Sequence, residues 1–186
     1  MLKRFAPELT VSRWFNTPAP LSLAALRGRV VWLHSFQMLC PGCVSLSIPQ
    51  AQKIEQVFRQ TDLQVIGLHT VFEHHEAMTP VALETFIHEY RITHPIGVDQ
   101  PNETGGFLPV TMERYQFQGT PSSVLIGRDG SILSAKFGTE DDMVVGARIA
   151  GALGMPVPAS IPEAAAPESC AEGTCTADIV PGVAQT

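Results

Sequence analysis

The sequence is poor in positive charge and in long hydrophobic runs, and each shortage excludes a class of function. Its 186 residues contain 12 Lys and Arg against 18 Asp and Glu, which leaves a formal net charge of −6. The basic surface typical of nucleic-acid-binding proteins is therefore not expected. Because no apolar stretch approaches the roughly 18–20 residues that span a bilayer, we also expect no membrane segment.

The N-terminal residues lack the features of an export signal. Lys3 and Arg4 supply positive charge, but no apolar stretch follows them, as a secretory signal requires. We therefore expect a cytoplasmic protein. In that reducing compartment, closely spaced cysteines are more often redox-active or metal-binding than structural.

Cysteine is scarce, and its four copies form two close pairs, Cys40/Cys43 and Cys170/Cys175. This pattern differs from the scattered cysteines of a disulfide-stapled secreted domain. With 45% hydrophobic residues, the chain can build an ordinary core without staples. The pairs therefore point to chemistry rather than to structural support.

The last stretch of the chain, residues 154–186, differs in composition from the rest. It has five prolines, seven alanines, no aromatic residue and no Lys or Arg. Such a segment cannot bury enough apolar surface to order itself. We therefore predict a folded domain over residues 1–153 and a disordered tail over 154–186 that carries Cys170 and Cys175.

Apolar runs and amphipathic patterns alternate along the predicted domain. Strands are expected at 30–36, 63–68 and 95–98, helices at 44–58, 79–90 and 139–153, and a hairpin at 122–127 and 132–137. Asp129-Gly130 marks the turn of the hairpin. The order predicts an α/β fold, with a central mixed sheet flanked by helices and an antiparallel edge.

The strongest chemical signal is Cys40-Pro41-Gly42-Cys43, between a predicted strand and a predicted helix. A sulfur at a helix N-terminus faces unpaired N–H groups, so it is partly ionised near neutral pH. Cys40 is thus predicted to attack a substrate disulfide, and Cys43 to resolve the mixed disulfide. The alternative interpretation is half of a structural zinc site, which needs two further ligands.

A second motif, Gly119-Thr120-Pro121-Ser122, precedes the hairpin. Together with the CPGC motif it resembles the thioredoxin superfamily. The resemblance implies a thioredoxin-like fold in which Pro121 is cis and lies beside the disulfide. It also implies that Thr120, Pro121, Pro41 and Gly42 contact the substrate, with the Thr120 backbone offering hydrogen bonds to an extended peptide.

Within that superfamily, residues 10–153 look like the TlpA/ResA-type and AhpC/TSA-like redoxins. The similarity is carried by segments 16–28, 67–73 and 94–99. Members of this type often have an acidic residue near the disulfide. Glu73 is the nearest match by position, with a gap of one residue, and would be a catalytic proton relay to Cys43. The alternative is a solvated loop glutamate beside His74 and His75. The chain departs from the pattern at Leu39, where Trp is common, so the surface beside Cys40 is aliphatic.

Two other functions use the same fold. A thiol peroxidase of the peroxiredoxin type would place Thr where Gln37 stands, so this interpretation is weaker. An SCO-like chaperone would bind Cu(I), here through Cys40, Cys43 and either His69 or His94. The favoured function, a thiol–disulfide oxidoreductase, needs neither metal nor organic cofactor, and its partners are thiol or disulfide proteins.

The tail pair Cys170/Cys175 suggests a second redox step. A flexible chain over the 17 residues from Leu153 to Cys170 has a typical end-to-end distance of about 20–25 Å. This reach is comparable to the size of a small domain, and tethering gives a high effective concentration. We therefore predict that the tail pair relays electrons to or from Cys40/Cys43. The alternatives are two incidental thiols or a tail that binds metal.

Overall fold

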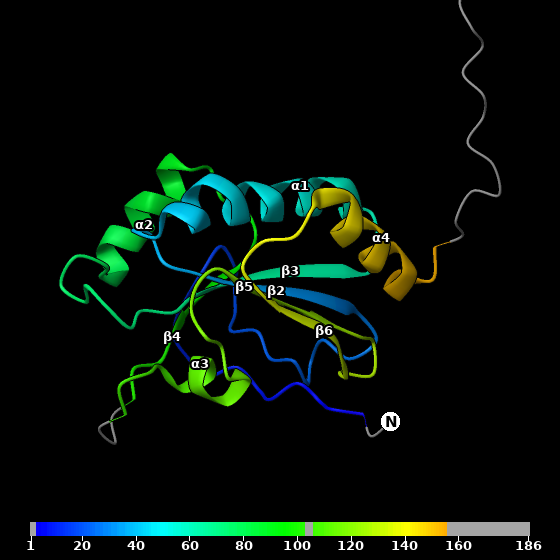
Figure 1. Cartoon of the computed structure of the whole chain (residues 1–186), viewed down its shortest axis with the longest axis horizontal. Coiled ribbons are helices and arrows are strands. Elements are labelled where there is room, and N and C mark those ends of the chain that lie inside the picture. The colour runs from blue at the N-terminus through cyan, green and yellow to red at the C-terminus, as the bar shows by residue number, and fades with distance from the viewer. Residues whose placement is uncertain (1–2, 103–105, 156–186) are drawn as a thin grey trace, which may run out of the picture. The chain divides into compact units, whose positions relative to one another are not determined.

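A six-stranded mixed sheet organises the computed structural model, which describes residues 3–102 and 106–155. The strand order is β1-β4-β3-β2-β5-β6 (Figure 1). The strands are β1 (Val11–Phe15), β2 (Val30–Phe36), β3 (Leu63–His69), β4 (Ile96–Asp99), β5 (Ser122–Ile126) and β6 (Ile132–Phe137). Strand β2 pairs in parallel with β3 and antiparallel with β5, which confirms the predicted mixed sheet.

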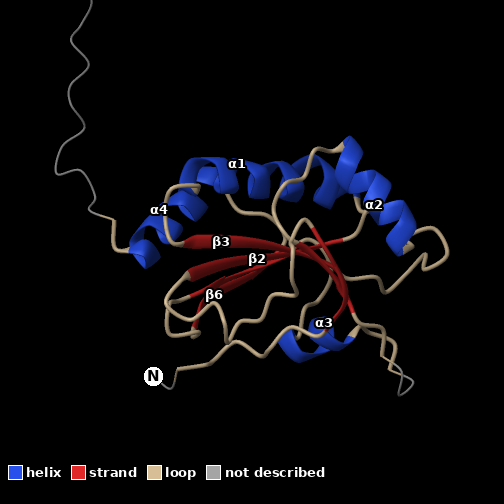
Figure 2. Ribbon diagram, turned by 180° about the vertical axis from the view of Figure 1, so that it is seen from behind, coloured by secondary structure: helices blue, strands red, loops and turns tan. Residues whose placement is uncertain are grey.

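Helices cover both faces of the sheet. The helices are α1 (Ile48–Phe58), α2 (Pro80–Glu89), α3 (Val110–Tyr115) and α4 (Asp142–Leu153), and a π-helical turn, η1 (Cys43–Ser47), precedes α1. Figures 1 and 2 show α1, α2 and α4 on one face and α3 on the other. The predicted thioredoxin-like architecture is confirmed.

Strand β2 lies in the middle of the sheet because its sequence, VVWLHSF, is almost entirely apolar. All seven residues are buried, as expected of a strand with neighbours on both edges and helices on both faces. Its side chains alternate between two cores. Val31 and Leu33 pack on the α3 side, whereas Trp32 and Phe36 face the layer of α1, α2 and α4.

Local signals set the helix ends. Thr79 caps α2, and its hydroxyl accepts a hydrogen bond from the Ala82 N–H. The last helix starts later than the predicted position 139, because the carboxylate of Asp141 accepts from the Met143 N–H and forms the N-cap. An acidic side chain there satisfies an otherwise unpaired backbone donor. The helix ends at Leu153, before Gly154 in a left-handed conformation.

Two elements were not predicted, strand β1 and helix α3. Strand β1 has the sequence VSRWF and lies at the edge of the sheet, partly exposed, so it lacks a clear alternating pattern. Helix α3 has six residues, too few for a helical period to show. Contacts with distant residues hold both elements. Strand β1 pairs with β4, and the N–H groups of Thr111 and Met112 in α3 donate to Asp99.

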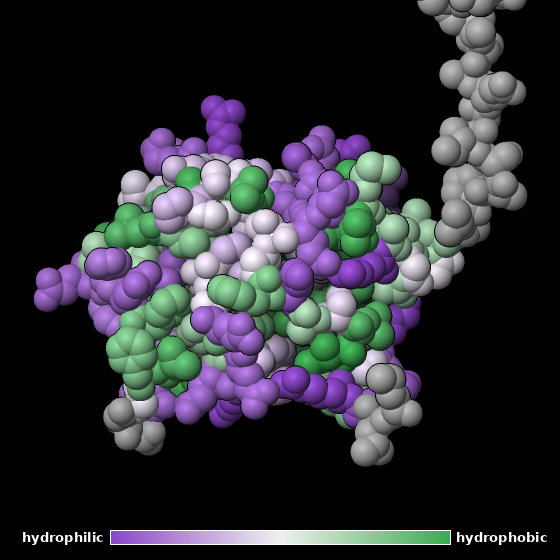
Figure 3. All heavy atoms as spheres, in the orientation of Figure 1, coloured by the Kyte–Doolittle hydropathy of each residue, from purple (hydrophilic) through white to green (hydrophobic). Residues whose placement is uncertain are grey.

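The surface mixes polar and apolar side chains (Figure 3). Figure 3 shows hydrophobic patches interspersed with hydrophilic ones on the face that it draws. Within the described residues, no helix has the length and apolar character that a bilayer crossing requires. The predicted disordered tail begins at 154, just after α4, and apart from its first two residues it lies outside the described part of the chain.

Candidate active site

The CPGC motif lies where β2 ends and the first helical turn begins. Cys40 immediately precedes this turn, and its carbonyl oxygen accepts from the N–H groups of Cys43 and Val44 at 3.0 and 3.1 Å. Cys43 opens the π-helical turn η1. The predicted strand-to-helix position of both cysteines is thus what the chain forms, with both thiols free.

The two sulfurs differ in access and in surroundings. Cys40 is partly exposed, whereas Cys43 is fully buried. The Cys40 sulfur accepts a hydrogen bond from the Cys43 N–H at 3.3 Å, and its thiol donates to the Thr120 carbonyl oxygen at 3.5 Å. Only Cys40 can therefore meet a substrate from solvent.

Burial makes Cys43 a weak acid. Desolvation, followed by its hydrogen bond with Cys40, raises the pKa of the Cys43 thiol to about 12. Contacts with Gln37 and Thr120 act in the opposite direction and lower this pKa. At neutral pH Cys43 is therefore a thiol, and it must lose its proton before it can act as a nucleophile.

The loop before β5 forms the other side of the site. The Thr120–Pro121 peptide bond is cis, as the resemblance implied. Gly42 lies against Pro121, since a Cβ on Gly42 would be 3.6 Å from the Pro121 ring. The loop is held by two hydrogen bonds, from the Ser122 hydroxyl to the Gly119 carbonyl and from the Gly138 N–H to the Pro121 carbonyl.

Gln37 links Glu73 to Thr120, whose carbonyl oxygen accepts from the Cys40 thiol, a link that the sequence did not predict. Its side-chain amide lies 3.5 Å from both Glu73 Oε1 and Thr120 Oγ1. Glu73 is exposed and Gln37 is buried. The structure thus brings Glu73 to the edge of the site, next to a side chain that also reaches Thr120.

Among the described residues, the histidines predicted as metal ligands do not join this group. Cys170 and Cys175 lie outside the described residues. Over residues 3–102 and 106–155, no three His, Cys, Asp or Glu side chains are grouped so that they could hold a metal ion. His94 instead faces His34, with 2.9 Å between their Nε2 atoms, and His69 is buried without a hydrogen bond to either ring nitrogen.

Comparisons with known proteins place this fold and sequence. Comparison with protein-family models gives no match, and neither does comparison with curated proteins. Among solved structures, a thioredoxin-like superfamily protein is 51% identical with a TM-score of 0.78, over 83% of this chain and 99% of that one. A thiol-disulfide isomerase from Corynebacterium glutamicum is 48% identical with a TM-score of 0.75, over 81% of this chain and 98% of that one.

A third solved structure has a similar fold at much lower sequence identity. A thiol:disulfide interchange protein of the thioredoxin family from Chlorobium tepidum is 18% identical, with a TM-score of 0.60 over 82% of this chain and 98% of that one. This likeness is one of fold. The first two matches span nearly all of their structures at about half identity, and the chain therefore belongs to the thioredoxin-like superfamily.

Proposed function

We propose that the protein catalyses thiol–disulfide exchange, with Cys40 as the attacking thiolate and Cys43 as the resolving thiol. The observation that carries this assignment is the contrast between the two sulfurs, one partly exposed at a helix start and one fully buried a single turn later. A 48% identical relative is named a thiol-disulfide isomerase. The protein is accordingly a thiol–disulfide oxidoreductase.

The reaction proceeds in two exchanges. The Cys40 thiolate attacks one sulfur of a substrate disulfide, forming a Cys40–substrate disulfide and releasing the other substrate sulfur as a thiolate. Cys43 then loses its proton and attacks Cys40, which forms the Cys40–Cys43 disulfide and releases the second substrate thiol. Two electrons pass from the cysteine pair to the substrate, so no organic cofactor or metal is required.

The loop at Thr120 and Pro121 is proposed to hold the substrate beside Cys40. Pro121 and Gly42 lie against each other, so these backbone segments form one wall. Leu39 and Leu46 flank the cysteines and are more than half exposed. A substrate with apolar residues next to its disulfide therefore fits this surface, because its binding would remove these side chains from water.

Glu73 is proposed to take part in proton transfer. Its contact with Gln37, and that of Gln37 with Thr120, support this role. We also propose that the protein is of the TlpA/ResA type within the superfamily and that it is located in the cytoplasm. A cytoplasmic setting would favour the reductive direction, in which Cys40/Cys43 reduces its substrates.

Trapping the intermediate tests the roles of the two cysteines. In full-length protein with Cys170→Ser and Cys175→Ser, the further change Cys43→Ser should accumulate a mixed disulfide with a model disulfide protein, detected by mass spectrometry. The matched variant Cys40→Ser should form none. An adduct of equal yield on Cys43 in the Cys40→Ser protein would reverse the assignment.

The tail pair is proposed as an electron relay. Its 17-residue separation from Leu153 supports this role, because a tether of that length gives an effective concentration of order millimolar. Turnover with a thiol reductant should therefore fall when Cys170 and Cys175 are both changed to Ser. Unchanged turnover would mean that the tail thiols take no part.

A further inference from the structure

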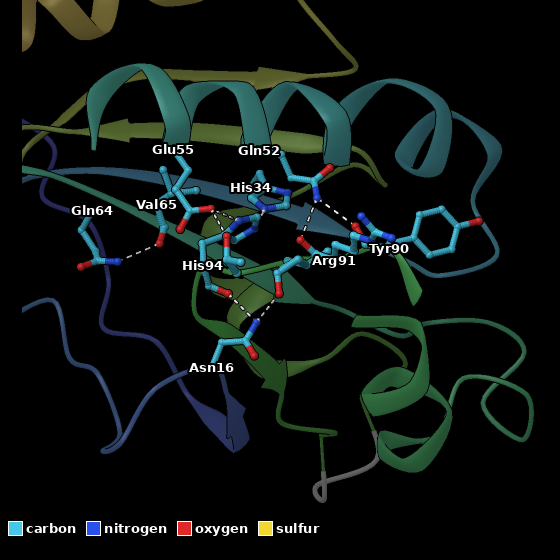
Figure 4. A network of polar contacts seen from close by, with 11 residues as sticks. Asn16, His34, Gln52, Glu55, Gln64, Val65, Tyr90, Arg91 and His94 are labelled. Carbon is cyan, nitrogen blue, oxygen red and sulfur yellow. Dashed lines mark hydrogen bonds and ion pairs between the residues drawn. The ribbon is translucent and has the colours of Figure 1, made fainter. Parts of the chain in front are cut away.

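Three titratable side chains from separate parts of the chain meet beneath α1. His34 comes from β2, His94 from the loop before β4, and Glu55 from α1 itself (Figure 4). The Nε2 atoms of the two histidines are 2.9 Å apart. His94 Nδ1 lies 3.5 Å from Glu55 Oε2, within ion-pair distance. We call this set the Glu55–His94–His34 relay.

The relay runs from solvent into the core. The side chain of Glu55 is 32% exposed, whereas His94 and His34 are each 1% exposed. Glu55 is fixed by a hydrogen bond from the Thr93 hydroxyl at 2.6 Å. Asn16 fixes the loop from below, since its Nδ2 donates to the carbonyl oxygens of Ile92 and His94.

The geometry determines where a proton can lie. An Nε2–Nε2 distance of 2.9 Å requires a hydrogen on one of the two nitrogens. Glu55 is ionised, because its contact with His94 lowers the pKa of the carboxyl. Burial, and then the neighbouring His94, lower the pKa of His34, so this ring is neutral. His94 is thus the ring that lies between a carboxylate and a neutral imidazole.

Through Phe36, the relay borders the side-chain cluster that contains Cys43. His34 and Phe36 lie on the same face of β2, and their rings stack with centroids 5.6 Å apart. Phe36 belongs to the cluster of buried side chains that contains Cys43. In this apolar surrounding a charge acts over a longer distance than in water. A positive charge on the histidine pair would thus favour the Cys43 thiolate.

Two arginines, Arg29 and Arg59, line the same pocket as Glu55, and in the described part of the chain few other charged groups face this layer. His69 of β3 packs against Phe36, but burial lowers its pKa to about 4, so it is neutral near pH 7. Helix α2 contributes apolar side chains. Lys53 of α1 is exposed and pairs with Asp142 of α4. Asp99 lies on the opposite face, where it contacts α3.

We propose that the Glu55–His94–His34 relay supports the resolving step by taking up a proton from solvent as Cys43 becomes a thiolate. This inference rests on the proposed function. Cys43 gives its proton to solvent, and its thiolate attacks Cys40, which forms the Cys40–Cys43 bond and breaks the Cys40–substrate bond. The released substrate thiolate takes a proton from solvent. The relay then returns its own proton through Glu55. No electrons pass through it, and the proton held by the histidine pair acts on Cys43 through its positive charge.

The resolving step can be observed alone. Reduced full-length protein with Cys170→Ser and Cys175→Ser is mixed in a stopped-flow instrument with an aromatic disulfide that releases a coloured thiolate. The first release reports attack by Cys40, and the second, independent of reagent concentration, reports attack by Cys43. The aromatic thiolate needs no proton to leave, so the second rate follows the thiolate fraction of Cys43.

The test is how the rate of the second release depends on pH. For an isolated thiol with a pKa far above the assay range, this rate falls tenfold for each unit by which the pH is lowered. In the parent protein, the fall should be shallower across the range where the relay gains its proton. His94→Gln cannot gain that proton, so its rate should fall tenfold per unit throughout and drop about three- to tenfold below that of the parent at acid pH.

Two further variants complete the test. Glu55→Gln, at a partly exposed position, should move the shallow region to lower pH, and it remains informative if His94→Gln fails to fold. His69→Gln is the matched control, a buried histidine outside the relay, and should keep the shallow region of the parent. Profiles of parent, His94→Gln and Glu55→Gln that coincide would overturn the relay. Loss of the second release in the parent itself would instead overturn the proposed function.

Discussion

The two faces of the sheet each bury a polar group, and the two are satisfied in different ways. On the α3 face, the Asp99 carboxylate accepts hydrogen bonds from the Thr70 hydroxyl and the N–H groups of Thr111 and Met112, at 2.8–2.9 Å. On the α1 face, His34 and His94 share one short contact, and His34 Nδ1 has no hydrogen-bond partner.

This difference separates a structural group from a responsive one. Asp99 holds the start of α3 against β4 and Thr70, and its full set of short hydrogen bonds leaves little freedom to change. The histidine pair has its mutual contact and an ion-pair distance of 3.5 Å to the partly exposed Glu55, and Nδ1 of both rings lacks a hydrogen-bond partner. The two groups also titrate with opposite consequences for stability, because burial raises the pKa of Asp99 and lowers that of His34.

The largest effect is expected at Asp99. Asp99→Ala leaves the Thr70 hydroxyl and two buried backbone N–H groups without their acceptor, which should reduce the free energy of unfolding by about 3 kcal/mol. Asp99→Asn keeps an acceptor oxygen and should lose about half as much. Urea unfolding measures both. The control is the exposed Asp129, and an equal loss in Asp129→Ala would show that Asp99 has no special structural role.

A loss of stability in acid is expected from His69. Burial lowers its pKa from 6.5 to about 4, so between these values the unfolded chain binds more protons than the folded one. His69 therefore costs no stability above pH 6.5. As the pH falls below that value, it lowers the free energy of unfolding, by about 3 kcal/mol at pH 4. His69→Leu should remove this part of the pH dependence and cost little at pH 7, since neither ring nitrogen is hydrogen-bonded.

Asp99 sharpens this pH experiment because acid changes its contribution to stability in the opposite direction to that of His69. Its folded-state pKa is raised, so its contribution to stability increases as the pH falls toward the unfolded value near 3.8. Asp99 therefore offsets part of the stability that His69 loses in acid. His88→Leu, at an exposed histidine, is the control for His69→Leu, and a change of slope in both variants alike would contradict the assignment to His69.

A smaller effect is expected at Asn16, which positions the loop of His94. Asn16 has a left-handed backbone with φ of 55° and donates two hydrogen bonds to that loop. Asn16→Ala should cost about 2 kcal/mol, from lost hydrogen bonds and from a conformation that alanine disfavours. Asn16→Gly tolerates the conformation and should cost about half as much. Thermal unfolding that ranks the two variants equally would assign the whole effect to the hydrogen bonds.

The elements of the central sheet could be predicted because their signals are local. Strand β2 follows from one apolar run, the hairpin from Asp129-Gly130, and α2 from Thr79-Pro80. The sequence also located the CPGC motif and, through a resemblance, the cis bond at Pro121. Each of these depends on residues that lie next to one another in the chain or on a motif of known spacing.

The parts that could not be predicted depend on distant contacts. His34 and His94 are 60 residues apart, and nothing near either of them indicates the other. The loop that brings His94 inward turns at Arg91, where a left-handed φ of 51° has no glycine to mark it. The sequence marks Gln37 only as the residue that stands where a peroxidase would place threonine, whereas in the structure its amide lies 3.5 Å from both Glu73 and Thr120.

The smallest effect is expected from polar contacts in solvent, which sets the scale for the buried ones. Lys53 and Asp142 join α1 to α4 at 2.8 Å, but their side chains are 65% and 49% exposed. Such pairs contribute about 0.2–1 kcal/mol and weaken in salt. Lys53→Ala should therefore change the free energy of unfolding by less than about 0.5 kcal/mol, and the change should shrink further in 1 M salt.

Because Asp142 also accepts from Gln50 at 2.8 Å, Gln50→Ala is the matched control without a charge, and its effect should not depend on salt. A loss at Lys53 as large as that at Asp99 would mean that burial does not decide how much a polar contact stabilises this fold.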